Sequence, residues 1–200
     1  MNNTVITTDL LESALGYDSY KKLILELLDQ NKVTGDFMDN NDWIVNYSKE
    51  NITRMAKGDA NVKLLEALET KLAAVEEKWT WVVITEGWCG DASQIVPIFV
   101  KLAAINPKHE IKFIFRDENP TVMEQYLTNG SKSIPKIAVF NEALEEVMVW
   151  GPRPAYAQQM TLDYNAKKDI SFGAYIKKLH EWYNQDEYQS VQKEVLEQLG

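Results

Sequence analysis

The chain has a single cysteine, Cys89, and the residues around it constrain the fold more than any other part of the sequence. An aromatic and β-branched run over residues 79–85 precedes the cysteine and is typical of a buried strand. The periodicity of residues 93–104 after the cysteine predicts a helix. A lone cysteine also excludes an intrachain disulfide and a cysteine-based metal cluster.

Composition narrows the class of protein further. Of the 200 residues, 45% are apolar, which suffices for a packed core, and the formal net charge is −9. Such a charge argues against binding to nucleic acid or to an anionic membrane surface. The N-terminus lacks the basic start and apolar run of a signal peptide, and no stretch has membrane-spanning length. Together with the low cysteine content, these features predict a soluble protein of the reducing cytoplasm.

Apolar periodicity predicts the order of the secondary-structure elements. Residues 1–77 read as helical, with loops at Gly35–Asp36 and Asp39–Asp42 and a helix end at Gly58–Asp59. Downstream, the predicted strands are 79–85, 111–115, 136–140 and 145–150, and the predicted helices are 93–104, 120–127, 172–183 and 191–199. The polar segment between residues 151 and 172 is predicted to be a loop.

This order is a βαβ unit followed by an antiparallel pair of strands. It predicts an α/β fold with a mixed sheet and helices on both faces. The chain is expected to comprise an N-terminal helical extension, residues 1–61, and a second unit, residues 62–200. No spacing of His, Asp or Glu resembles a metal site, so no metal is expected.

Four features occur together at a characteristic spacing. Trp88–Cys89–Gly90 follows a strand and opens a helix, and Pro97 lies within that helix. Ser133–Ile134–Pro135 precedes the strand at 136–140, and Gly151 follows the last strand. Over roughly residues 62–185, the chain thereby resembles the thioredoxin family. The resemblance implies a thioredoxin-like fold and a cis peptide bond before Pro135.

The resemblance also implies a site. Cys89 is then the catalytic residue, because a helix N-terminus that presents its thiol to solvent stabilises the thiolate. The backbone of Ile134 beside the cis proline is expected to be exposed and to pair with an extended partner segment. Trp88 is expected on the exposed rim. The expected binding residues are Trp88, Gly90, Asp91, Ile134, Pro135 and Arg153.

The chain departs from the family pattern where a second sulfur is needed. Ala92 occupies the position of the family's second cysteine, so the internal disulfide cannot form. Val83 occupies the position of a buried acid that serves that second cysteine. Asp91, with Glu86 adding to its effect, raises the pKa of the thiol, whereas the helix dipole lowers it. The sequence leaves open which effect prevails.

Three further positions have alternative interpretations. Arg153 either contacts an anion or a carboxylate near Cys89 or forms a surface salt bridge, and the salt bridge is favoured. Surface positions are expected for His109 and His180. The helical extension either covers the sheet where the family's first strand would lie or caps the cysteine face.

Three functions remain open at this stage. In the first, a monothiol redox protein in cell redox homeostasis, Cys89 forms a mixed disulfide with glutathione or a protein partner. The second is a redox-inactive binding module that keeps the docking groove beside Pro135. The third is a glutathione-using transferase, although the helical C-terminal domain of such enzymes is missing. No resident cofactor is expected, glutathione being a co-substrate, and whether the chain is an enzyme stays open.

Overall fold

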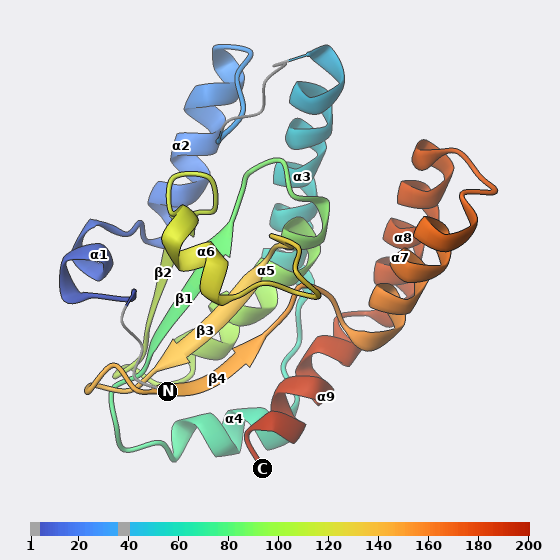
Figure 1. Cartoon of the computed structure of the whole chain (residues 1–200). Coiled ribbons are helices and arrows are strands. Elements are labelled where there is room, and N and C mark those ends of the chain that lie inside the picture. The colour runs from blue at the N-terminus through green and yellow to red at the C-terminus, as the bar shows by residue number, and fades with distance from the viewer. Residues whose placement is uncertain (1–4, 36–40) are drawn as a thin grey trace.

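A four-stranded mixed sheet forms the centre of the molecule in the computed structural model, which describes residues 5–35 and 41–200 (Figure 1). The sheet order is β2-β1-β3-β4, with β1 parallel to β2 and antiparallel to β3, and β3 antiparallel to β4. The strands are β1 (Thr80–Thr85), β2 (Glu110–Phe115), β3 (Lys136–Phe140) and β4 (Glu146–Trp150). The predicted mixed sheet is confirmed, whereas residues 1–4 and residues 36–40, which include parts of both predicted loops, lie outside the described residues.

Helices cover both faces of this sheet. In Figure 1, α5 lies behind the strands and α6 lies in front of them. The described helices are α1 (Thr8–Ser13), α2 (Tyr17–Asp29), α3 (Asp42–Asn61), α4 (Glu66–Ala73), α5 (Gly90–Ala104), α6 (Pro120–Gln125), α7 (Ala155–Lys167), α8 (Phe172–Asp186) and α9 (Gln189–Gln198). None of these helices is both long and apolar enough to cross a membrane.

Strand β1 is the element that places the cysteine. All six of its residues are buried, as expected of a central strand covered on both faces. Trp81 on this strand packs on Phe99 of α5, with ring centroids 6.2 Å apart, and Phe99 packs in turn on Trp150 of β4. The end of β1 and the start of α5 are therefore fixed to the same core, and Cys89 lies between them.

The N-terminal extension covers the free edge of the sheet. The backbone of Leu15 forms two hydrogen bonds with Phe113 of the edge strand β2, at 3.0 and 2.8 Å. The ring of Tyr20 on α2 stacks on Phe113 with a centroid separation of 4.7 Å. Pairing and covering the strand in this way protects an edge that would otherwise present unpaired backbone groups.

Helix α3 approaches α5 closely at Gly58. The sequence predicts that Gly58 ends the helix, but α3 continues to Asn61, so this prediction is wrong. A Cβ atom at Gly58 would lie 2.7 Å from the ring of Pro97 inside α5. The glycine therefore permits the close approach of the two helices and does not act as a helix stop.

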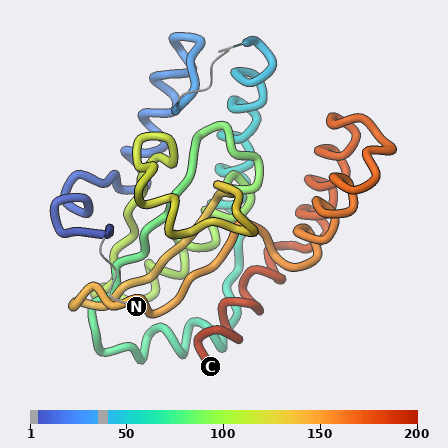
Figure 2. Tube along the Cα trace, in the orientation of Figure 1, coloured from blue at the N-terminus to red at the C-terminus, as the bar shows by residue number. Residues whose placement is uncertain are grey.

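Helices α7 and α8 form an arm that projects from the end of the sheet (Figures 1 and 2). Helix α7 replaces a predicted loop. Only Ala157 is buried in α7, so its other apolar residues form no stripe that periodicity could detect. The arm is held together by aromatic stacking, with the rings of Tyr164 and Tyr175 4.3 Å apart.

The close approach of α3 to α5 predicts that replacing Gly58 by alanine destabilises the protein, although alanine has the higher helix propensity. Gly58→Ala should lower the free energy of unfolding by about 1–3 kcal/mol, because the rigid proline ring cannot move away from the new methyl group. The measurement is urea unfolding followed by circular dichroism. The control is Gly173→Ala on α8, where nothing lies within 4 Å of the new Cβ. A stabilised Gly58→Ala protein would contradict the close approach.

Candidate functional site

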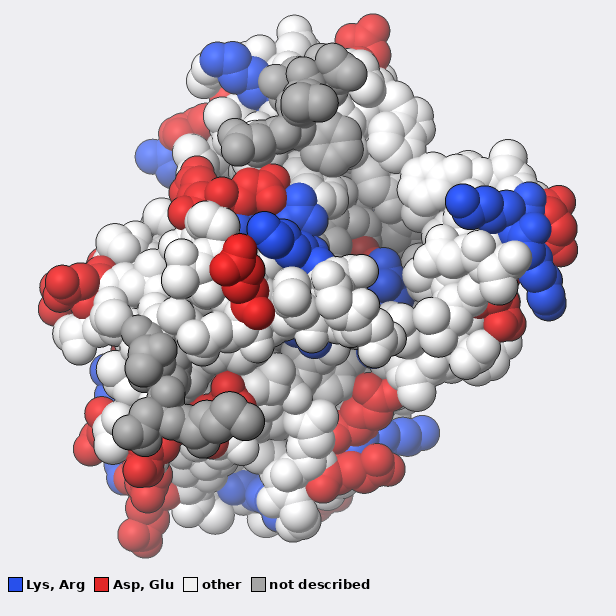
Figure 3. All heavy atoms as spheres, in the orientation of Figure 1, with Lys and Arg blue, Asp and Glu red and all other residues white. Residues whose placement is uncertain are grey.

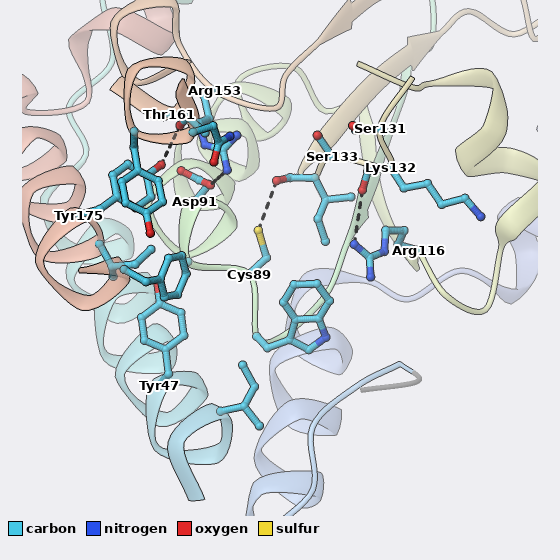
Figure 4. A pocket seen from close by; sticks show the side chains of 18 of the residues that line it. Tyr47, Cys89, Asp91, Arg116, Ser131, Lys132, Ser133, Arg153, Thr161 and Tyr175 are labelled. Carbon is cyan, nitrogen blue, oxygen red and sulfur yellow. Dashed lines mark hydrogen bonds and ion pairs between the residues drawn. The ribbon is translucent and has the colours of Figure 1, made fainter. Parts of the chain in front are cut away.

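A cleft of about 590 Å³ opens between α3 and the α7–α8 arm, and Cys89 lies in its wall. Figure 3 shows the hollow from outside, and Figure 4 shows the side chains that surround it. Its lining combines large aromatic and apolar side chains with a few polar groups. The lining residues include Trp43, Tyr47, Trp88, Cys89, Asp91, Arg116, Lys132, Ile134, Arg153, Tyr164, Phe172 and Tyr175.

Cys89 caps the N-terminus of α5 with its sulfur. The Sγ atom accepts a hydrogen bond from the backbone N–H of Ala92 at 3.4 Å and donates one to the carbonyl oxygen of Ile134 at 3.4 Å. Only 6% of the residue is exposed. The predicted helix-start position is confirmed, but the predicted exposure of the thiol is wrong, because the segment before Pro135 covers the sulfur.

This environment keeps the thiol protonated. Burial raises the pKa of Cys89 to about 12, and the negative charge of Asp91 adds to the effect. The N–H of Ala92 and the positive charge of Arg153 act in the opposite direction but do not prevail. The sequence leaves open whether the helix dipole or the carboxylates determine the pKa of Cys89. In the structure burial contributes most, and the sequence does not show this contribution.

The peptide bond before Pro135 is cis, as the sequence predicts, and the bond between Gly151 and Pro152 is a second cis bond that the sequence analysis missed. Ile134 lines the cleft but is only 5% exposed, and its carbonyl already accepts the thiol of Cys89. The open backbone edge expected beside Pro135 is therefore not present.

The N-terminal extension holds the loop that leads to Cys89. The hydroxyl of Thr34 accepts the N–H of Gly87 at 2.9 Å, and its carbonyl accepts the indole N–H of Trp88 at 3.1 Å. From α3, the side-chain amide of Asn51 donates to the carbonyl of Gly87 at 3.2 Å. The extension thus covers the sheet edge and also caps the cysteine face, so both sequence-based alternatives apply.

Trp88 forms part of the cleft rim. It is half-buried and lines the cleft, in line with the rim position expected for it. The guanidinium of Arg116 lies over its ring, 4.8 Å from the centroid, and donates to the carbonyl of Lys132 at 3.4 Å. Arg116 was not identified from the sequence, because it lies in the loop after β2 and no local motif marks it.

Asp91, which is buried, and Arg153, which is partly buried, form an ion pair in the wall of the cleft. A nitrogen of Arg153 lies 2.6 Å from the Asp91 carboxylate, and the hydroxyl of Tyr183 on α8 donates to the same carboxylate at 2.8 Å. Burial disfavours the positive charge of Arg153, but the negative charge of Asp91 raises the pKa of Arg153 above its ordinary value. The favoured surface salt bridge is therefore wrong: Arg153 contacts a carboxylate near Cys89, that of the buried Asp91 two positions after it.

Both histidines lie away from open solvent, contrary to the expected surface positions. The ring of His109 stacks on Trp79 with a centroid separation of 5.2 Å. His180 is buried on α8, accepts from the side-chain amide of Gln94 at Nδ1, and lies 2.9 Å from the hydroxyl of Tyr47 at Nε2. Burial lowers the pKa of His180 to about 4, so the ring is neutral near pH 7.

Glu86 is buried directly before the cysteine loop. Its carboxyl accepts the hydroxyl of Thr34 and, at 3.0 Å, the backbone N–H of Asp117. Burial raises its pKa to about 7, although both hydrogen bonds favour the charged form. Glu86 is therefore close to half-protonated near pH 7 and contributes less negative charge to the site than its sequence position suggests.

The two departures from the family pattern are structurally coherent. Ala92 and Val83 are both buried, with 1% and 0% of their surfaces exposed. Apolar side chains therefore fill the positions where a second thiol and an acid would act. Within the described ranges, no group of three His, Cys, Asp or Glu residues is placed to hold a metal ion.

Tyr47 and Tyr175 were not among the predicted site residues. They come from α3 and α8, which are far apart in the sequence, and Figure 4 places them with Asp91 and Arg153 on one side of Cys89 and Arg116 on the other. The available signal is the pair Trp43 and Tyr47, one helical turn apart, whose rings stack at 5.3 Å. That signal identifies an aromatic face but not the cleft that it lines.

The raised pKa of Glu86 predicts a pH-dependent stability. With a folded pKa of about 7 against an ordinary 4.5, the folded state binds the extra proton, so this contribution is complete below pH 4.5 and is lost as pH rises through 7. Between pH 5 and 8, the free energy of unfolding of the native chain should fall by about 2 kcal/mol relative to that of Glu86→Gln. Urea titrations at each pH measure this difference, and parallel curves for the two proteins would contradict it.

The buried ion pair predicts strong coupling between two residues. Asp91→Asn leaves the guanidinium of Arg153 enclosed without its counter-charge and should lower the free energy of unfolding by about 3 kcal/mol. Adding Arg153→Met should recover part of this loss, so that the two substitutions couple by more than about 1 kcal/mol in a double-mutant cycle. Additive losses would show that the pair does not interact in solution.

Comparison with known proteins agrees with this architecture. A sequence model of the family described as thioredoxin matches residues 37–169, which is more than half of the chain. A protein of unknown function from Pseudomonas aeruginosa has a similar structure, with a TM-score of 0.58 and 14% identity over 95% of this chain and 94% of that one.

A second solved structure, an HIV epitope scaffold, has the same TM-score of 0.58 and identity of 14%, over 96% of this chain and 95% of its own. At this identity the two structures support the fold alone. No curated protein sequence matches the chain. The extent of the family match nevertheless shows that the chain belongs to the thioredoxin family.

Proposed function

We propose that the chain is a ligand-binding member of the thioredoxin family that does not cycle a disulfide. One observation supports this most directly. The thiol of Cys89 is 6% exposed and donates to the carbonyl of Ile134, while the cleft beside it stays open. The protein surface that is available to a second molecule is thus the cleft, and the sulfur forms part of its wall.

Chemistry and size both favour binding over exchange. Burial raises the pKa of Cys89, so the thiol is protonated at pH 7, whereas the thiolate is the form that attacks a disulfide. Ala92 provides no sulfur that could resolve a mixed disulfide. The cleft volume of about 590 Å³ and its aromatic lining with a few polar groups are typical of sites for small molecules.

Monothiol exchange is the second candidate, and the position of the sulfur favours it. Sγ caps α5 and accepts the N–H of Ala92, which is the geometry that stabilises a thiolate. In that reaction, the Cys89 thiolate attacks a disulfide of glutathione or a protein partner, forms a mixed disulfide and releases one thiolate. An external thiol then attacks the mixed disulfide and regenerates Cys89.

The reactivity of Cys89 distinguishes the two functions. In the folded protein, alkylation by iodoacetamide at pH 7.5 should be at least ~100-fold slower than in urea, because burial suppresses the thiolate. The rate should keep rising with pH up to pH 10 without reaching a plateau. Since Cys89 is the single cysteine of the chain, incorporation measured by mass spectrometry reports on this residue alone.

The same experiment has an outcome that favours exchange. A plateau in the alkylation rate, with a midpoint below the ordinary thiol pKa of about 8.5, would assign the chain to monothiol chemistry. A stable adduct after incubation with oxidised glutathione would lead to the same conclusion. The Ala92→Ser variant is a control, because a hydroxyl at this position cannot resolve a mixed disulfide.

A further inference from the structure

The cleft is the basic part of an acidic molecule. Among its described lining residues, Arg116, Lys132 and Arg153 are basic and Asp91 alone is acidic, whereas the whole chain has a net charge of −9. Arg153 pairs with Asp91, and Arg116 pairs with the Asp117 carboxylate at 2.7 Å, so Lys132 is the basic residue of the described lining that lies outside both ion pairs. Figure 3 shows basic side chains beside the hollow. The electrostatic potential of the cleft therefore favours a negatively charged occupant.

The rest of the lining favours an apolar body on that occupant. Trp43 and Phe172 are 53% and 50% exposed, and their rings lie 6.1 Å apart, so they connect α3 to the arm at the cleft. Tyr164 and Tyr175 continue this aromatic surface along the arm. A ligand that covers these exposed rings removes a large apolar area from water.

A hydrogen-bond chain fixes the proton of Tyr47. The side-chain amide nitrogen of Gln94 can only donate, so Nδ1 of the neutral His180 accepts and its proton is on Nε2. Nε2–H then donates to the hydroxyl oxygen of Tyr47 at 2.9 Å. Within the described part of the chain, no carboxylate or carbonyl accepts the hydroxyl hydrogen of Tyr47, so it is available for a group in the cleft.

Tyr175 in the same cleft is a natural contrast. Thr161 donates its hydroxyl hydrogen to the carbonyl of Ala157 at 2.9 Å. Its oxygen must therefore accept the hydroxyl hydrogen of Tyr175, which lies 2.8 Å away. Of this pair, Tyr47 has a hydrogen to donate to a ligand and Tyr175 does not; the third tyrosine of the lining, Tyr164, stacks on Tyr175.

We propose that the ligand of this cleft is a small organic anion, a carboxylate with an aromatic or aliphatic body, that accepts a hydrogen bond from Tyr47. Lys132 supplies the positive charge at the rim, next to the Arg116–Asp117 ion pair, and the rings of Trp43 and Phe172 contact the apolar body. This inference rests on the proposed binding function and specifies the chemical class of its ligand.

The test is a binding titration with matched probes. The probes are 3-phenylpropanoate, hexanoate and indole-3-acetate, each compared with its primary amide and with the amine of equal length. Binding is followed by the indole N–H signals in ¹⁵N-correlated NMR spectra, since two of the six tryptophans, Trp43 and Trp88, line the cleft and the other four report on the rest of the molecule.

The expected result is selective binding of the acids. They should shift the signals of Trp43 and Trp88 and bind at least about tenfold more tightly than the amides and amines, with affinity falling as salt is added. Tyr47→Phe should weaken the binding of the acids about tenfold, because it removes a hydrogen bond to a charged acceptor. The affinities of the amines should change little. Tyr156→Phe, at an exposed tyrosine of α7 outside the cleft lining, is the matched control and should stay within about twofold of the native protein.

The remaining outcomes separate this inference from the function on which it rests. Equal or tighter cleft binding of the amides or amines would overturn the anion proposal and leave the binding function standing. Acid binding that Tyr47→Phe does not weaken would overturn the role of Tyr47. If no probe at concentrations up to about 10 mM shifts the signal of either cleft tryptophan, the anion proposal is overturned. The alkylation profile of Cys89 then decides separately between binding and exchange.

Discussion

The ion pair between Asp91 and Arg153 holds the parts of the site together. Asp91 belongs to the first turn of α5, Arg153 follows β4, and Tyr183, which also donates to Asp91, lies on α8. The pair therefore joins the sheet, the helix that begins at the cysteine and the projecting arm. An enclosed pair of charges is weak evidence for stability but has strict geometric requirements. Because both partners must be satisfied, the arm has a defined position, and the cleft between it and α3 has a defined shape.

The same burial that defines the cleft suppresses the chemistry of the family's sulfur. A helix N-terminus alone would favour the Cys89 thiolate, but the cover provided by Ile134 removes the solvent that a charged sulfur needs. The polar side chains Thr34 and Asn51 of the extension fix the loop before the cysteine and so limit how far the thiol could move outwards. The molecule retains the architecture of a thiol site while its accessible surface has become aromatic and basic.

Local patterns predicted most of the fold, and long-range contacts explain what they missed. The strands, the α5 start at Cys89 and the cis bond before Pro135 depend on short motifs, and the structure contains them all. Helix α7 has no apolar stripe and was read as a loop. The positions of Arg153 and His180 depend on partners 62 and 86 residues away, at Asp91 and Gln94, and no single-sequence pattern encodes such pairings.

The connection between Tyr47 and His180 has a consequence for biosynthesis. These residues are separated by 133 positions, and the hydrogen bond between them joins α3 to α8 across the base of the cleft. Chains emerge from the ribosome N-terminus first, so the sheet and the cysteine loop are synthesised well before α8 is available. The cleft can be completed only when the last helices have left the exit tunnel. A nascent chain that lacks α8 therefore lacks one wall of the cleft, and the proposed binding requires that helix.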